Sequence, residues 1–125
     1  MNAMGLFEKA MEMLGYASAE GISGREDILK KALTIINNVY AELHYAFVQK
    51  LGEEDSFVPL TNINDTLNLP NVVLNDIAPY GVAMYLAQSE GDADSQALYA
   101  NIYNQKKVRG KRIGKIKDRL PHIWG

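Results

Sequence analysis

The sequence predicts an all-α fold, a bundle of four to five helices, from three observations. Apolar residues recur at steps of three and four over long stretches, which is the period of a helix that buries one face. Glycine and proline residues separate these stretches and leave short connections between them. Apolar residues make up 47% of a 125-residue chain, which suits one domain with a single core. We therefore expect a single helical domain over residues 1–125, with residues 106–125 as a basic C-terminal extension.

The first two helices are predicted from apolar stripes. One stripe consists of Leu6, Phe7, Ala10 and Leu14. A longer one consists of Leu29, Ala32, Leu33, Ile36, Val39, Tyr40, Leu43 and Phe47. Ser23 and Glu26 match a capping box at the start of the second stripe, and Gly52 follows its end. We predict helices over residues 4–16 and about 24–50, and the second, about 40 Å long, is expected to be the long central helix.

Residues 53–69 carry no helical stripe. Pro59 blocks a regular helix, and the asparagine and aspartate residues of the segment favour turns. The apolar residues between positions 57 and 63 allow a short β segment within this loop.

Residues 72–87 are apolar on nearly every face, which is typical of the most buried helix of a bundle. Pro70 suits the start of this helix, and Pro79 is expected to kink it or divide it. Gly81 is expected to let another backbone approach closely, and Gly91 to stop the helix.

A last helix is predicted over about residues 94–108, capped by Asp92 or Asp94. Its expected apolar stripe consists of Leu98 and Ile102 with Ala97 beside them. Gly110 is expected to end it, because glycine commonly follows the last turn of a helix. Beyond Gly110 no single period fits, so the tail is expected to be extended, partly ordered or a strand added to a neighbour.

The sequence contains no pattern typical of a catalytic, cofactor-binding or metal site. The sequence has no cysteine, which excludes disulfides and thiolate ligands. His44 and His122 lack a partner at helical metal-ligand spacing and are interpreted as packed or surface side chains. The acidic runs at 53–55 and 92–94 are interpreted as a solvated turn and a helix cap. We therefore expect no enzyme, no small-molecule substrate and, without an apolar run of about 18 residues, no membrane span.

The basic C-terminal tail is the feature with functional content. Residues 1–105 hold 5 Lys+Arg against 14 Asp+Glu, whereas residues 106–125 hold 8 against a single aspartate. An acidic body with a basic tail points to an anionic partner or a charged subunit interface. The candidate interface or anion-contact residues are Lys106, Lys107, Arg109, Lys111, Arg112, Lys115, Lys117, Arg119 and Trp124. Three interpretations stay open: a solvated tail, a protein interface, or a nucleic-acid contact.

Four short motifs add a family resemblance. They are INDTLNLP at 63–70, PYGVAMYLA at 79–87, GD at 91–92 and YANIYN at 99–104. In this order they resemble the head–tail connector (neck, or head-completion) proteins of tailed phages and prophages, over about residues 25–105. Pro79 is a departure, because a proline is not expected within the central helix of that family.

The resemblance implies a non-enzymatic structural subunit without cofactors that joins a ring beneath the portal and offers a docking surface for the tail. Its implied partners are further copies of itself and other neck or portal proteins, with DNA nearby. Its implied place is the bacterial cytoplasm during assembly and then the virion neck. The alternative is a small helical nucleic-acid-binding regulatory module that uses the basic tail. Against that alternative, the acidic body would repel a phosphate backbone.

Overall fold

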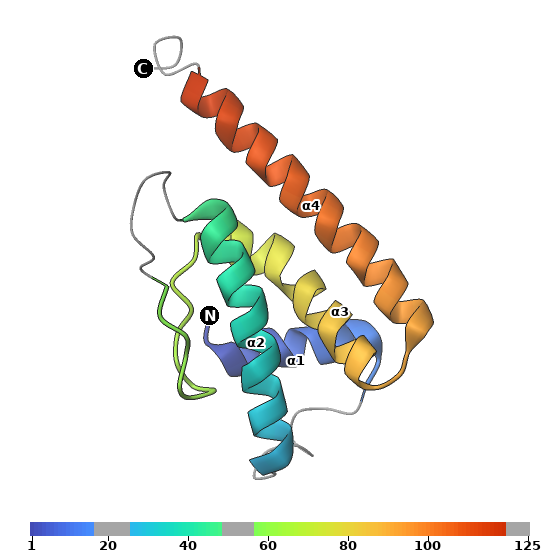
Figure 1. Ribbon diagram of the computed structural model, residues 1–125. Helices are drawn as coiled ribbons and strands as arrows, with labels where there is room; N and C mark the ends of the chain where they lie inside the picture. Colours follow the sequence, from blue (N-terminus) through green and yellow to red (C-terminus); the bar gives the residue numbers. More distant parts are fainter. Residues whose placement is uncertain (17–25, 49–56, 120–125) are drawn as a thin grey trace.

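A computed structural model of the chain describes residues 1–16, 26–48 and 57–119, with the backbone alone described at 26–28 and 112–119. These residues form a mainly α-helical bundle, which confirms the predicted fold class (Figure 1). Its helices are α1 (Ala3–Leu14), α2 (Glu26–Phe47), α3 (Ala78–Ser89) and α4 (Ala93–Arg119), with a π-helical turn, η2 (Val73–Ile77), leading into α3.

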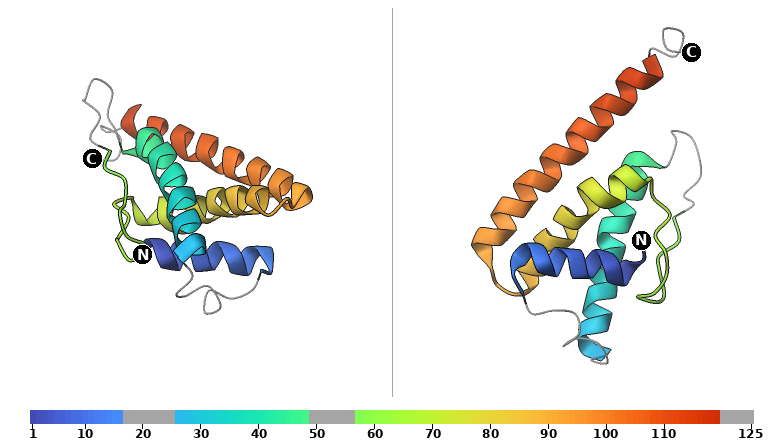
Figure 2. Two further views of the ribbon diagram at one scale, coloured as in Figure 1. Left: turned by 60° about the horizontal axis from the view of Figure 1, so that its bottom comes forward. Right: turned by 180° about the vertical axis from the view of Figure 1, so that it is seen from behind.

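Helix α3 lies in the middle of the bundle. Helices α1 and α4 pack on opposite sides of it, and α2 crosses it (Figure 2). It makes the most extensive contacts of any described helix, as its all-round apolar pattern predicts. The helix expected over 24–50 is therefore not the central one, and α4, with 27 residues against 22 in α2, is the longer helix.

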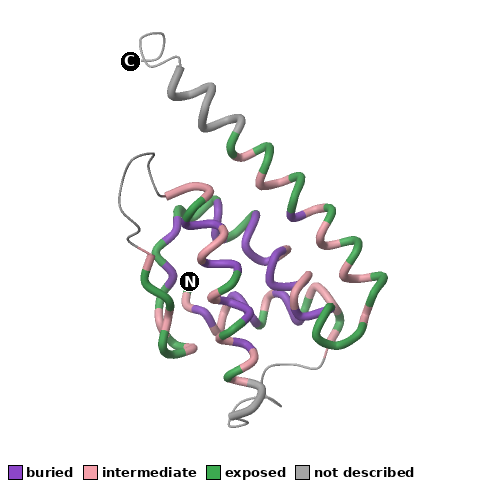
Figure 3. The backbone as a smooth tube through the Cα atoms, viewed as in Figure 1, coloured by how far each residue is buried: buried purple, intermediate pink, exposed green. Residues whose placement is uncertain are grey.

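The inward faces of α1 and α2 follow the predicted stripes (Figure 3). On these two helices the buried apolar residues are Ala3, Leu6, Phe7, Ala10, Met11, Ala32, Ile35, Ile36, Val39, Tyr40 and Leu43. Helix α1 ends at Gly15, whose φ of 72° is the left-handed conformation that glycine adopts without strain. The capping box at Ser23 and the stop at Gly52 fall outside the described residues.

The loop over residues 57–69 contains no strand in its described part. It pairs with the N-terminus through one isolated bridge between Asn2 and Thr66. The Asn37 side chain bonds both backbone groups of Leu60, at 2.9 and 2.8 Å. The short β segment expected here is thus reduced to a single bridge, because the chain turns at 61–65, where Asp65 accepts from two backbone N–H groups.

Pro79 divides the helix, as its position predicts. Proline has no N–H, and its ring clashes with the carbonyl four residues earlier in an α-helix. Here the backbone widens into a π-type turn, in which the Ala78 N–H bonds the Val73 carbonyl. The Asn75 carbonyl, which cannot bond Pro79, accepts instead from the Lys9 ammonium of α1 at 3.2 Å.

The turn between α3 and α4 confirms the predicted stop and cap. Gly91 has a φ of 73°, and the Asp92 side chain accepts from the Ser95 N–H at 3.2 Å. Hydrogen bonds from Ser95 hold the pKa of Asp92 below its usual value. The other Asp92 oxygen accepts from the Tyr16 hydroxyl at 3.1 Å, so the end of α1 is tied to the start of α4.

Two glycine predictions were wrong. Gly81 faces a side chain and not another backbone, because a Cβ atom at position 81 would lie 2.7 Å from Tyr103 Cζ. Gly110 does not end α4, which continues to Arg119. A Cβ atom at position 110 would lie 2.9 Å from Phe47 Cε1, so this glycine allows α4 to approach the end of α2.

The face that α4 buries also differs from the prediction. Leu98 is 54% exposed and Ala97 is exposed, whereas Tyr103 is 1% exposed and Tyr99 is half-buried. Tyr99 and Tyr103 occupy the buried face of α4 because their large rings bury more apolar area than Leu98 or Ala97 would. The rings are also long enough to contact α3 and α1. Tyr99 stacks near the Tyr80 ring, at 6.2 Å between centroids, and donates to the Met13 carbonyl at 3.0 Å.

Candidate functional site

Helix α4 carries all eight of the basic candidates. Its straight-chain lysines and arginines are good helix formers, and cations near the C-terminal end of a helix interact favourably with its dipole. These effects explain why the helix passes through Gly110 and does not become an extended tail. In Figure 1, α4 runs beyond the end of α2, so its C-terminal part extends past the packed body. We call residues 109–119 the basic arm; Trp124 lies outside the described residues.

The two basic residues that precede the arm are bound internally. Lys106 Nζ lies 2.9 Å from Asp76 Oδ1 and 5.0 Å from the centre of the Tyr80 ring. Lys107 Nζ lies 3.8 Å from Glu42 Oε1 and 4.1 Å from the centre of the Tyr103 ring. A cation over an aromatic face is attracted by the ring quadrupole, so both lysines help to hold α4 on the bundle.

The first two cations of the basic arm are accessible to solvent. Arg109 and Lys111 are exposed, and neither forms an ion pair with another described residue. The backbone places four further cations on the same helix, and their side chains lie outside the described part of the structure. They are Arg112, Lys115, Lys117 and Arg119.

A carboxylate on α2 organises the contact between α2, α3 and α4. Tyr85 donates to Glu42 Oε2, and Tyr103 donates to Glu42 Oε1 at 2.9 Å. Burial, together with the bond to Glu42 and its charge, raises the pKa of Tyr85 to about 12. Burial and the Glu42 charge likewise raise the pKa of Tyr103. Both tyrosines therefore remain neutral donors at ordinary pH and link Glu42 on α2 to α3 and α4.

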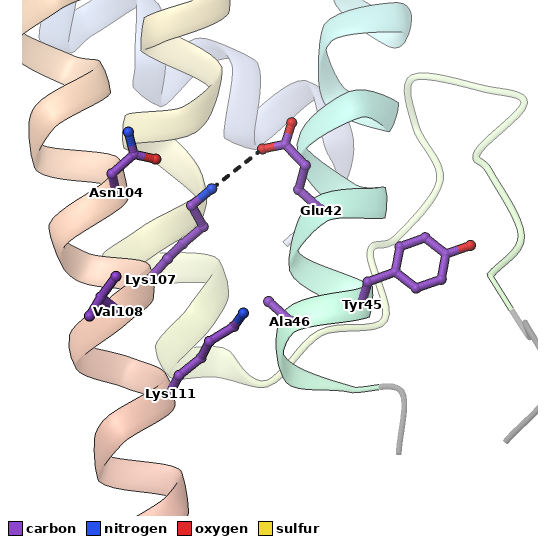
Figure 4. Close-up of a pocket in the computed structure, with 7 residues that line it drawn as sticks. All are labelled: Glu42, Tyr45, Ala46, Asn104, Lys107, Val108 and Lys111. Carbon is purple, nitrogen blue, oxygen red and sulfur yellow. Dashed lines mark ion pairs between the residues drawn. The ribbon is translucent and has the colours of Figure 1, made fainter. Parts of the chain in front are cut away.

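An open groove of about 490 Å³ lies between α2 and α4, next to this carboxylate (Figure 4). Helix α2 supplies Glu42, Tyr45 and Ala46, and α4 supplies Asn104, Lys107, Val108 and Lys111. Figure 4 shows the Lys107 side chain directed towards Glu42 and the Lys111 side chain directed towards α2. The groove thus combines two ammonium groups one helical turn apart with apolar surface from Val108, which is 50% exposed.

The sequence identified Lys107 and Lys111 as candidate contact residues, but it did not identify Glu42, the acidic residue of the groove. Glu42 lies beside the apolar stripe of α2. This position of a carboxylate next to a buried stripe was the one feature of the sequence that could have identified it as part of the groove. Its two tyrosine donors come from other helices, so no spacing along the sequence links them to it.

The other candidates from the sequence take structural roles. His44 is a packed side chain, as predicted, 7% exposed and with its ring 5.5 Å from that of Phe57. His122 and the acidic run at 53–55 lie outside the described residues. Within the described ranges, no three His, Asp or Glu side chains gather as a metal site would require. No helix of the described chain is both long and apolar enough to cross a bilayer.

Comparison with known proteins adds no relative. No protein-family model matches the sequence, and no curated protein or solved structure shows significant similarity to it.

Proposed function

We propose that this protein is a non-enzymatic structural adaptor of a tailed phage or prophage, which assembles into a ring of identical subunits between portal and tail. The observation that carries the proposal is the separation of charge along one continuous helix. Helix α4 begins on an acidic body, at Asp92 and Asp94, and ends in the basic arm. The motif resemblance to head–tail connector proteins supplies the phage context.

A separation of this kind suits head-to-tail assembly. Each subunit offers both halves of a complementary pair, and contacts of this type close into rings when the rotation between neighbours allows it. Because Lys106 and Lys107 are engaged within the subunit, the six cations from Arg109 to Arg119 remain for contacts outside it.

The test is the native mass of the full chain by light scattering over a concentration series, with negative-stain images of the same samples. We expect the mass to rise to that of a closed oligomer that appears as rings. A chain lacking residues 112–125 keeps Gly110 against Phe47, so its body should fold with unchanged thermal stability while ring formation is lost. Rings that form equally well without residues 112–125 would contradict the role of the arm, and a full chain that stays monomeric throughout would contradict self-assembly.

A nucleic-acid-binding module is the second candidate, and the exposed Arg109 and Lys111 favour it. If all six cations of the basic arm contacted duplex phosphates, affinity would fall with salt at a log–log slope of about −5. A slope near −7 would require Lys106 and Lys107 to leave Asp76 and Glu42. A binding titration on duplex DNA at low salt separates this function from the adaptor: no binding at about 50 mM salt removes it.

A further inference from the structure

The groove between α2 and α4 has charge and apolar surface that the subunit itself does not satisfy. Lys111 is exposed without an ion pair among the described residues. Lys107 is held by Glu42, at 3.8 Å, and by the Tyr103 ring, but its side chain is still 24% exposed at the groove. Val108, which is half-exposed, adds apolar surface at the α4 edge of the groove. A matching occupant would carry two carboxylates about one helical turn apart on a helical surface.

The outer face of α1 has this pattern. Glu8 and Glu12 are exposed and four residues apart, so they lie on one side of the helix, about 5–6 Å apart at Cβ. Neither side chain forms a hydrogen bond or ion pair with any other described residue. The opposite face of α1 is buried in the core, so this acidic face is held outward.

The acidic face and the groove cannot meet within one subunit. Helices α1 and α4 lie on opposite sides of α3 in the left view of Figure 2. They are linked near the start of α4, where Tyr99 donates to the Met13 carbonyl, and the groove lies further along α4, at residues 104–111. Contact between them requires a second copy, and such a contact joins two different surfaces. An open chain of copies then still offers one free groove at one end and one free acidic face at the other, which is the condition for ring growth.

We infer that the α2–α4 groove binds α1 of a neighbouring copy, with Glu8 and Glu12 of one subunit facing Lys107 and Lys111 of the next. The inference rests on the self-assembly proposed above and adds, at the base of the basic arm, a second contact to the one proposed for residues 112–119. Their spacing matches, since both pairs are four residues apart on a helix. The contact is electrostatic at its edge and apolar at Val108, which favours a salt-sensitive association.

The test uses two reversed variants of the full chain. Glu8→Lys with Glu12→Lys makes the α1 face basic, and Asn104→Glu with Lys111→Glu makes the groove acidic. All four positions are exposed, so thermal unfolding should change little. Lys107 is left in place because Glu42 and Tyr103 hold it. We expect either variant alone to raise the association midpoint by about tenfold or more in light scattering, because like charges face each other.

Mixing the two variants is the decisive step, because the basic α1 of one then meets the acidic groove of the other. We expect the mixture, and a chain carrying all four substitutions, to recover association close to that of the wild type. Lys30→Glu with Asn38→Glu is the matched control, since both residues are exposed on α2 outside the groove and the pair changes the charge as much as the groove variant does; it should leave the midpoint unchanged.

The outcomes separate the two proposals. A wild-type chain that assembles, while the mixed variants fail to recover, overturns the pairing of α1 with the groove and leaves the adaptor function standing. A wild-type chain that never assembles overturns the adaptor function itself. Reversed variants that assemble as well as the wild type also overturn the pairing.

Discussion

The ring of Tyr103 packs against Gly81, where a Cβ atom would come within 2.7 Å of Cζ and 2.8 Å of Cε1. This contact brings α4 close to α3 and places the Tyr103 hydroxyl 2.9 Å from Glu42 on α2. Three helices are thus joined through one side chain, and the same side chain gives Lys107 an aromatic face.

Gly81→Ala tests this contact, because the contact decides whether the substitution raises or lowers the free energy of unfolding. At an open helical position the change would stabilise by about 1 kcal/mol, because alanine is the better helix former. Here the added methyl overlaps a fully buried ring, so we expect destabilisation of about 1–3 kcal/mol in chemical denaturation. In a Tyr103→Leu background the same change should cost less, and an equal cost in both backgrounds would contradict the contact.

Lys9→Met tests how the carbonyl left free by Pro79 is satisfied. We expect a loss of about 0.5–1.5 kcal/mol in the free energy of unfolding, because the Asn75 carbonyl loses its donor. In a Pro79→Ala background the loss should be smaller, since residue 79 then supplies its own N–H. Lys30→Met, at an exposed site on α2, is the control and should be near neutral. Equal losses in both backgrounds would show that Lys9 and residue 79 do not compete for this carbonyl.

The Glu42 cluster predicts a loss of stability at alkaline pH. The pKa of Tyr85 is about 12 in the folded chain and about 10 when unfolded, so the folded state holds this proton more tightly. The corresponding stabilisation is complete below pH 10 and is lost as the pH rises towards 12. Tyr85→Phe should therefore reduce the fall in stability over this range.

The same group can be followed directly by tyrosinate absorbance. The difference in titration between the wild type and Tyr85→Phe should have its midpoint near pH 12 while the helical signal persists. A midpoint at pH 10 in a chain that is still helical would show that Tyr85 does not donate to Glu42 in solution.

Gly110→Pro tests whether α4 continues into the basic arm. Proline within a helix removes a hydrogen bond, clashes with the carbonyl of residue 106 and costs about 3 kcal/mol or more. We expect the arm to lose its helical signal in circular dichroism and to become sensitive to trypsin, with cleavage starting at Lys111. An unchanged helical content would mean that the helix already ends at Gly110 in solution.

The local features of the fold could be predicted from the sequence, because each depends on residues that are close together along the chain. The stripe of α1, the stop at Gly91, the cap at Asp92 and the break at Pro79 follow from helix period and backbone chemistry. The basic composition of the C-terminal segment was equally visible, although not the helix that contains it.

What the sequence by itself determined is therefore the helical class, most helix boundaries and the separation of charge. Only the tertiary structure decided that Gly110 packs against Phe47, that Tyr103 replaces Leu98 on the buried face of α4, and that Glu42 joins two tyrosines and Lys107. Those features depend on residues from different helices that meet in space. A glycine that ends a helix and one that admits a neighbouring ring have the same local pattern, and packing energy selects between them.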